Sequence, residues 1–378
     1  MCLSLMKHDN DLIGIYVHIP FCVRKCAYCD FLSFSADEQM HNQYVNSLCK
    51  QIDASDKSCR VASIYIGGGT PSVIASELIE TILCKLKEGF VILPDAEITI
   101  EVNPKTVTKD SLKKYRAMGI NRLSIGLQSA NNDELKLLGR IHSFEDFLNC
   151  YADAKAAGFD NVNIDIITAL PGQTKEMLSN TLDKVIELNP EHISAYSLIL
   201  EEGTPFYDLY GDSQIMSEDD ERGLYYLCRD RLIDAGYLQY EISNFAREGY
   251  YSRHNTSYWT RRDYLGLGLG ASSLIKDHRI KNETDIHKYI KNPLAKCEDI
   301  TLDKKSKMEE FMFLGLRKMC GVNVLEFESE FDVIYDEIYG EITQKLIDQG
   351  VLKRINEFVL ITNKGIDYGN YVFSSFLL

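Results

Sequence analysis

A regular alternation of apolar, strand-like runs with amphipathic, helix-like runs is the feature of this sequence that most constrains its fold. Six strand-like runs lie before residue 200, at Gly14–Ile19, Ser63–Gly67, Glu97–Val102, Arg122–Leu127, Asn161–Thr168 and His192–Leu198. Helix-like runs lie between them, at Glu38–Ile52, Ser76–Lys87, Lys109–Met118, Asp133–Leu138, Phe144–Ala157 and Thr174–Leu188. Strands that alternate with helices form parallel sheets with the helices outside. The sequence therefore predicts an α/β fold built on six βα units.

The chemically distinctive segments directly follow the predicted strands. They are Cys22–Cys29, Gly67–Pro71, Asn103–Pro104, Gln128–Ser129 and Leu170–Gln173. A parallel sheet that curls into a barrel binds its ligands at the carboxyl ends of its strands. We therefore expect these segments to meet at one end of a partial (βα)6 barrel.

Composition limits the classes of partner and compartment. The 378 residues carry a formal net charge of −15, which disfavours contact with phosphate backbones, so nucleic acid is not an expected partner. No apolar run reaches the ~18 residues of a membrane helix, and Met1–Asn10 does not resemble a secretory signal. We expect a cytoplasmic protein without stable membrane insertion. In such a compartment the 11 cysteines are not expected to form a disulfide framework.

The chain is long enough for more than one domain. We predict a barrel over residues 1–240, an aromatic and glycine-rich connecting segment over 241–300, and a C-terminal domain over 301–378. Within the connecting segment, we interpret the glycine-rich run Leu265–Ala271 as a tight turn beside the barrel. The last region predicts helices followed by a hairpin, which resembles a winged helix, at Lys304–Arg317, Val324–Phe331, Ile334–Gln349, Leu352–Ile355 and Phe358–Ile361.

Three cysteines are clustered with the spacing Cys-x3-Cys-x2-Cys, at Cys22, Cys26 and Cys29. Thiolates this close in sequence can hold one metal cluster from a single loop. An iron–sulfur cubane normally takes four thiolates, so three leave one iron with an open coordination position. A zinc site or a chance group of buried cysteines is the alternative interpretation, although a zinc site would need a fourth ligand.

With Tyr28 before the last cysteine, this loop resembles that of the radical-SAM superfamily. The resemblance implies a radical-SAM TIM-like barrel with a [4Fe-4S] cluster whose open iron chelates S-adenosylmethionine. Electron transfer from such a cluster cleaves the sulfonium and gives a 5′-deoxyadenosyl radical. The cofactor then supplies the reactive chemistry, and the protein supplies orientation and exclusion of water.

Longer segments resemble the oxygen-independent coproporphyrinogen III oxidase-like family. They are Tyr16–Cys22, Gly67–Pro71, Glu101–Pro104, Ser124–Ser129, Asn163–Ile167 and Leu170–Gly172, together with the C-terminal module. Carried over residue by residue, Tyr16, Gly68 and Glu101 match positions that line one S-adenosylmethionine in the oxidase. Positions lining a second molecule there match Tyr28, Gly69, Thr70, Gln128, Arg140 and Asp165. From the residues alone, Glu101 could instead be a solvated strand end, and Arg140 and Asp165 could form an ion pair.

Three features favour the HemW-type heme chaperone branch of this family over the true oxidase. Phe31 stands where the oxidase usually has a fourth cysteine, and only 21 residues precede Cys22. The segment from His254 to Trp259 resembles the His-Asn-x-x-Tyr-Trp sequence of the chaperones. The resemblance leaves open whether the chain is an enzyme, and the oxidative decarboxylation of a porphyrinogen remains the alternative function.

Heme requires an axial ligand, flat aromatic walls and cations for its propionates. We expect these from His254, from Tyr258 with Trp259, and from Arg253 with Arg261 or Arg262. The alternative is that His254 only forms hydrogen bonds in a loop beneath the barrel. The chaperone branch implies heme as cargo, apo-hemoproteins such as respiratory cytochromes as recipients, and an electron donor. A homodimer is left open.

Overall fold

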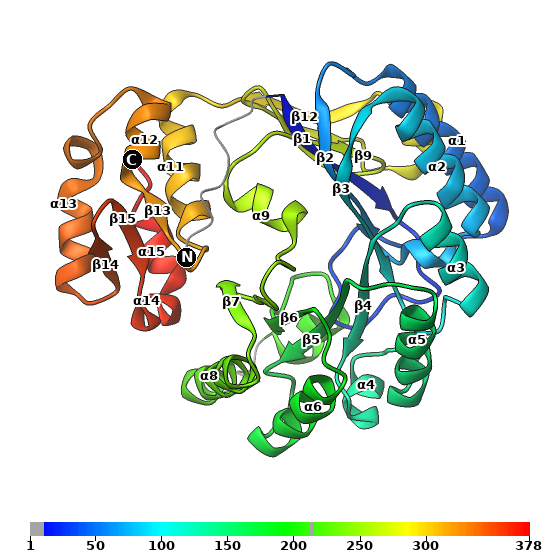
Figure 1. Cartoon of the computed structure of the whole chain (residues 1–378), viewed down its shortest axis with the longest axis horizontal. Helices are drawn as coiled ribbons and strands as arrows, with labels where there is room; N and C mark the ends of the chain where they lie inside the picture. The colour runs from blue at the N-terminus through cyan, green and yellow to red at the C-terminus, as the bar shows by residue number, and fades with distance from the viewer. Residues whose placement is uncertain (1–10, 212–214) are drawn as a thin grey trace.

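The computed structural model describes residues 11–211 and 215–378, and six parallel strands form its centre (Figure 1). The strands are β1 (Leu12–Ile19), β2 (Arg60–Gly68), β3 (Val91–Val102), β4 (Arg122–Gln128), β5 (Val162–Thr168) and β6 (His192–Ser197). They pair in sequence order with parallel registers. The helices that follow them are α1 (Glu38–Ala54), α2 (Ser76–Gly89), α3 (Lys109–Ala117), α4 (Asn132–Leu137), α5 (Phe144–Ala156) and α6 (Lys175–Glu187), with a 3-10 turn at Pro71–Val73. The predicted βα units are confirmed.

Local sequence explains where these helices begin and end. Thr108 and Ser143 each cap a helix by accepting a hydrogen bond from the third residue inside it, and that residue bonds back to the cap. Gly119 and Gly158 follow α3 and α5 with positive φ angles of 95° and 89°, as C-terminal caps do. Each helix therefore stops just before the next strand, which returns the chain to the sheet.

The end of the predicted barrel and the predicted connecting segment add further strands to the same sheet. These are β7 (Leu238–Glu241), β8 (Asn244–Ala246), β9 (Tyr264–Leu267), β10 (Ser272–Ile275), β11 (His278–Asn282) and β12 (Lys296–Thr301), with helices α9 (Arg253–Trp259) and α10 (Ile286–Lys291). The sheet order is β12-β11-β10-β9-β1-β2-β3-β4-β5-β6-β8-β7, and β9 runs parallel to β1. In Figure 1, α9 lies between the sheet and the C-terminal helices.

The interpretation of Leu265–Ala271 as a turn was wrong for its first half. Leu265, Gly266 and Leu267 lie in β9, and the chain turns only afterwards, at Gly268–Gly270. A Cβ on Gly266 would lie 2.0 Å from the carbonyl oxygen of Ser272, so this glycine allows β10 to approach closely. The glycines therefore serve strand packing as well as the turn.

Two helices between β6 and β7 were not predicted. They are α7 (Pro205–Tyr210) and α8 (Glu218–Asp234). α8 buries only a narrow stripe, Leu224, Cys228 and Leu232, and begins with four acidic residues. The first turn of α7 packs on the cysteine loop, because the amide of Phe206 donates to the carbonyl oxygen of Ala27 at 2.9 Å.

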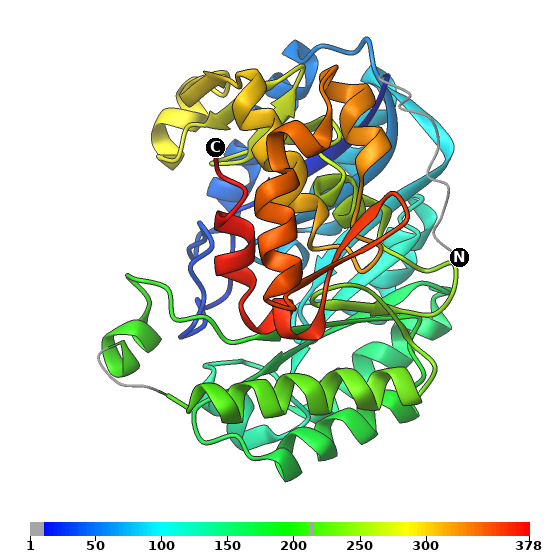
Figure 2. The ribbon, with the colours of Figure 1, turned by 90° about the vertical axis from the view of Figure 1, so that its left-hand side faces the viewer.

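The C-terminal region has its own apolar core and lies beside the barrel (Figures 1 and 2). It contains α11 (Lys304–Gly315), β13 (Val322–Asn323), α12 (Val324–Phe331), α13 (Tyr335–Asp348), β14 (Leu352–Ile355), β15 (Phe358–Ile361), α14 (Asn363–Asp367) and α15 (Gly369–Ser374). Helices with a small antiparallel sheet agree with the predicted winged-helix-like fold, and the α/β fold class is confirmed. The domain boundaries stay a prediction. None of the helices described here is long and apolar enough to cross a membrane.

Candidate functional site

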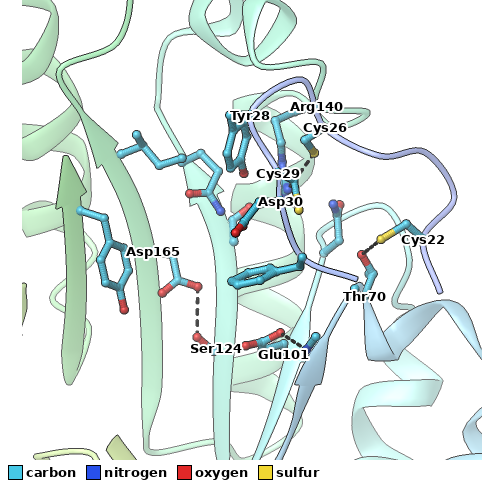
Figure 3. A pocket seen from close by; sticks show the side chains of 18 of the residues that line it. Cys22, Cys26, Tyr28, Cys29, Asp30, Thr70, Glu101, Ser124, Arg140 and Asp165 are labelled. Carbon is cyan, nitrogen blue, oxygen red and sulfur yellow. Dashed lines mark hydrogen bonds between the residues drawn. The ribbon is translucent and has the colours of Figure 1, made fainter. Parts of the chain in front are cut away.

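The three clustered cysteines lie on the loop between β1 and α1, at the carboxyl end of the sheet (Figure 3). Backbone hydrogen bonds hold the loop at both ends. The amide of Cys22 donates to Phe34 at 3.0 Å, and that of Ala27 donates to Leu138 at 3.1 Å. Cys22 is 8% exposed, and Cys26 and Cys29 are half-buried. The thiols are therefore fixed in a partly dry environment, and burial raises the pKa of the Cys29 thiol.

The surroundings of the thiols fit an iron–sulfur cluster. The Cys22 sulfur lies 3.5 Å from the Thr70 hydroxyl, and the Arg140 guanidinium donates to the Cys26 sulfur at 3.5 Å. Such contacts to sulfur tune a cluster. A Cβ on Gly69 would lie 2.8 Å from the carbonyl oxygen of Phe21 and 3.0 Å from the Cys22 sulfur, so glycine is needed for this approach.

The thiols do not form a site for one metal ion. In residues 11–211 and 215–378, no three His, Cys, Asp or Glu side chains converge where a single ion could be held. The thiolates of a cubane bind different irons, so they need not converge on one point. The donor set therefore fits a cluster better than the zinc site considered above.

A first cavity of about 400 Å³ opens beside these thiols. It contains eight of the predicted cofactor positions, namely Tyr28, Gly68, Gly69, Thr70, Glu101, Gln128, Arg140 and Asp165. Sequence reasoning missed other residues that line it, among them Tyr65, Ser124 and Tyr196. Tyr65 and Ser124 lie two residues before Gly67 and Gly126 on their strands, so the alternation of strand faces could have identified them.

Glu101 is held at the centre of this cavity's floor. Its carboxylate accepts a hydrogen bond from the amide of Gly68 at 3.0 Å and from the hydroxyl of Tyr65 at 2.8 Å (Figure 3). Gly68 has a φ of 113°, a conformation that favours glycine. Burial raises the pKa of Glu101 to about 7. The carboxyl is therefore an acceptor whose ionisation changes near neutral pH.

In the part of the chain that the structure describes, Arg140 and Asp165 do not pair with each other, so the ion pair considered in the sequence analysis is not formed. Asp165 accepts hydrogen bonds from Ser124 at 3.1 Å and from Asn163 at 2.7 Å, and burial raises its pKa. Arg140 instead donates to the carbonyl oxygen of Gly126 at 2.8 Å. Both charged side chains line the first cavity, which supports a role in binding.

His254 and Tyr16 lie outside the first cavity. His254 is 1% exposed beneath the sheet, and both ring nitrogens are used: Nδ1 lies 2.9 Å from the Ser63 hydroxyl and Nε2 lies 2.8 Å from the Tyr258 hydroxyl. Burial lowers the His254 pKa to about 3. This geometry matches the alternative in which His254 only forms hydrogen bonds. Ligation of heme iron by His254 would require breaking one of these bonds.

Replacing His254 with alanine is expected to lower the free energy of unfolding by about 2–4 kcal/mol. The change leaves a cavity and removes a partner from Ser63 and from Tyr258. Chemical denaturation of the full chain measures this. Arg253→Ala is the neighbouring control, because Arg253 is half exposed in a surface ion pair with Asp95 and should change stability by less than about 1 kcal/mol. Equal stability of both variants and wild type would contradict a structural role for His254.

A second cavity of about 770 Å³ lies between strands β9–β11 and α11. Aromatic side chains form much of its wall, including Tyr16, Tyr258, Trp259, Tyr264 and Phe313. Arg317 from beyond α11 stacks on the ring of Trp259, with its guanidinium carbon 4.4 Å from the ring centroid. The volume of this second cavity is within the ~300–1,000 Å³ that is usual for ligand sites.

The second cavity is rich in cations although the chain is acidic. Arg261, Arg262, Arg279 and Lys281 line it, against the carboxylates of Asp30 and Glu310. Arg261 is already paired with Asp277, Glu310 and Glu330, and Arg279 is paired with Glu310 at 2.6 Å. The side chains of Arg262 and Lys281 form no ion pair with any residue that the structure describes. Arg253, predicted as a cation for propionates, does not line this cavity.

Comparison with known proteins agrees with this geometry. The Radical SAM superfamily profile matches residues 16–185, and the HemN C-terminal domain profile matches residues 302–368. The heme chaperone HemW of Lactococcus lactis is 39% identical over 96% of this chain and 97% of its own length. The proteins of the same name from Bacillus subtilis and Escherichia coli are each 33% identical, over 96% and 97% of this chain and 98% of their own lengths.

The structure of coproporphyrinogen III oxidase (HemN) from Escherichia coli superposes with a TM-score of 0.82. The two chains are 24% identical, and the match covers 97% of this chain and 90% of that one. At this identity the likeness concerns the fold. The full-length sequence relatives are more specific, and the chain therefore belongs to the radical SAM superfamily and, within it, to the HemW heme chaperone family.

Proposed function

We propose that this protein is a heme chaperone that binds heme on a radical-SAM scaffold and transfers it to apo-hemoproteins. The observation that carries the proposal is the second cavity, a large aromatic space beside the predicted cofactor site, in which Arg262 and Lys281 form no ion pair with the described residues. An enzyme acting on a porphyrinogen would hold its substrate at the cofactor. A chaperone needs a place for cargo that leaves the cofactor in position.

Cys22, Cys26 and Cys29 would hold a [4Fe-4S] cluster, which supplies an open iron and an electron. Around it, the chain's own groups would hold S-adenosylmethionine. The Glu101 carboxylate can accept hydrogen bonds from ribose hydroxyls. Gly68, Gly69 and Thr70 allow backbone to approach the ligand closely, and Gln128, Arg140 and Asp165 also line the cavity.

In the second cavity, Tyr258, Trp259 and Phe313 would flank the porphyrin plane. Arg262 and Lys281 would hold the two propionates, since charge-assisted hydrogen bonds to carboxylates are the strongest such contacts. Tyr16, predicted to line a cofactor position, lines this second cavity instead, and its hydroxyl lies 2.9 Å from His18 Nδ1. His254 supports the wall from beneath through Tyr258.

The test is an anaerobic assay of the reconstituted full chain with heme and, in parallel, with coproporphyrinogen III, S-adenosylmethionine and a reductant. Stoichiometric heme binding, transfer to an apo-cytochrome, and no protoporphyrinogen are the expected results. Sustained protoporphyrinogen production would instead identify an oxidase. That second candidate is kept because the first cavity contains all the polar groups predicted for the cofactor except Tyr16 and His254. The electron donor and the respiratory recipients remain part of the proposal.

Affinity for S-adenosylmethionine is expected to fall as the pH is lowered below about 7. The pKa of Glu101 is about 7 in the free protein, and a ligand that donates hydrogen bonds prefers the ionised carboxylate. Binding therefore weakens as protons compete, by up to about tenfold per pH unit well below the pKa. Equilibrium dialysis between pH 6 and pH 8 measures this.

Glu101→Gln is the control for that experiment, because the ammonium of the ligand also titrates near this range. The variant should bind weakly and keep only the ligand's own pH dependence. The difference between the pH profiles of wild type and variant gives the contribution of the Glu101 carboxyl to binding. Profiles that run parallel for wild type and Glu101→Gln would show that Glu101 does not contact the ligand in its ionised form.

A further inference from the structure

One short segment belongs to both cavities. Asp30 and Phe31 line the first cavity and the second, while every other lining residue faces only one of them. The segment directly follows Cys29, so Phe31 lies within ~7 Å of a predicted cluster ligand along the backbone. Two ligands bound at the same time would therefore contact the same two side chains.

The backbone of this segment is fixed. The carbonyl oxygen of Leu32 lies 2.8 Å from His18 Nε2, that of Phe31 accepts from the Ser33 hydroxyl at 3.2 Å, and the amide of Phe34 donates to Pro20 at 2.9 Å. A Cβ on Gly270 would lie 2.6 Å from a methyl carbon of Leu32, so the chain is also closely packed. Any response of the segment to a ligand must therefore come from its side chains.

The side chain of Phe31 is free to respond. Phe31 is 60% exposed, so packing against other side chains does not fix its ring. A ligand on either side would cover part of the ring and restrict its rotation. Restricting such a side chain costs about 0.5–1.5 kcal/mol of conformational entropy, and this cost arises only once when both ligands are bound.

Asp30 is expected to favour simultaneous binding of the two ligands as well. Figure 3 shows its carboxylate directed into the first cavity, below Cys29. It forms no ion pair with the residues that the structure describes. Its negative charge opposes propionates in the second cavity, and a sulfonium in the first cavity would offset it.

We propose that Asp30 and Phe31 couple the two cavities, so that S-adenosylmethionine strengthens the binding of heme. The proposal rests on the proposed function, since it takes the second cavity as the heme site. The cofactor then acts as a regulator of cargo affinity, in addition to any radical chemistry. By thermodynamic linkage, heme must strengthen the binding of S-adenosylmethionine by the same factor.

The experiment is an anaerobic heme titration of the reconstituted full chain, with and without saturating S-adenosylmethionine. Trp259 is the only tryptophan and lines the second cavity, so quenching of its fluorescence reports heme occupancy. The expected result is heme affinity about two- to tenfold higher with the cofactor. Unchanged or lower affinity would overturn the proposal. Absence of heme binding under both conditions would instead overturn the proposed function.

Variants separate the two contributions. Phe31→Ala and Asp30→Asn should each reduce the coupling factor, and the double variant should bring it close to one. Phe313→Ala and Ile199→Ala are matched controls that line only the second and only the first cavity. They should change one affinity each and leave the coupling factor intact. A double variant that keeps the full factor would overturn the assignment to this segment.

S-adenosylhomocysteine is the matched ligand, since it lacks the sulfonium charge. It should retain the part of the coupling that depends on Phe31 and lose the part that depends on Asp30. In Asp30→Asn the two ligands should therefore give the same factor. A larger factor for S-adenosylmethionine in that variant would contradict the electrostatic contribution.

Discussion

Cys26→Ser is expected to abolish the iron–sulfur cluster, with iron content falling from about four atoms per chain to near zero. The two remaining thiolates, Cys22 and Cys29, cannot hold the cluster without the third ligand. The Cys26 sulfur accepts a hydrogen bond from the Arg140 guanidinium, which is a donor and cannot bind iron. Visible absorption and iron analysis after anaerobic reconstitution measure the loss. Binding of S-adenosylmethionine should fall at least about 100-fold, since the open iron is lost.

Cys84→Ser is the matched control, because Cys84 is a free and exposed cysteine on α2, far along the chain from the loop. It should reconstitute like wild type. Circular dichroism should show the same fold for both variants, since the cysteine loop is held by backbone hydrogen bonds rather than by its sulfurs. A Cys26→Ser protein with a full complement of iron would contradict the assignment of this loop.

The barrel could be predicted from the sequence because its strands are continuous apolar runs bounded by caps. Ile64, Ile66 and Ile100 are fully buried on one face of the sheet, as expected for strands whose alternate residues face the core. α8 was missed because its buried stripe contains one residue per helical turn, Leu224, Cys228 and Leu232, which gives a weak period. β9 was missed because Gly266 lacks a side chain, so its part in a strand depends on β10.

The first cavity was also predictable, since its residues directly follow strands that end at one edge of the sheet. The second cavity was not, because its walls come from β1, β9–β11 and α11, which are distant in sequence. For the same reason His254 was predicted as a heme ligand from the resemblance of its segment and from its imidazole, without knowledge of its neighbours. Only the fold shows that Ser63, on β2, and Tyr258, one turn along α9, use both of its nitrogens.

Replacing Arg262 and Lys281 with alanine is expected to weaken heme binding by about tenfold each and by about 100-fold together. The estimate takes one charge-assisted hydrogen bond per propionate, at the low end of its range because both side chains are partly or fully exposed. The effects should add if each cation holds a different propionate. Fluorescence of Trp259 during heme titration measures the affinities, and higher salt should reduce the difference between wild type and variants.

Arg253→Ala is the control on the protein side, since Arg253 pairs with Asp95 and does not line the second cavity. Arg261→Ala would be a poor probe, because it would break the ion pairs of Arg261 with Asp277, Glu310 and Glu330 and so disturb the cavity wall. The dimethyl ester of heme is the control on the ligand side. It lacks both propionate charges, so wild type should bind it as weakly as the double variant binds heme. If the double variant still prefers heme to the ester, the propionates lie elsewhere, and the orientation proposed for the cargo is wrong.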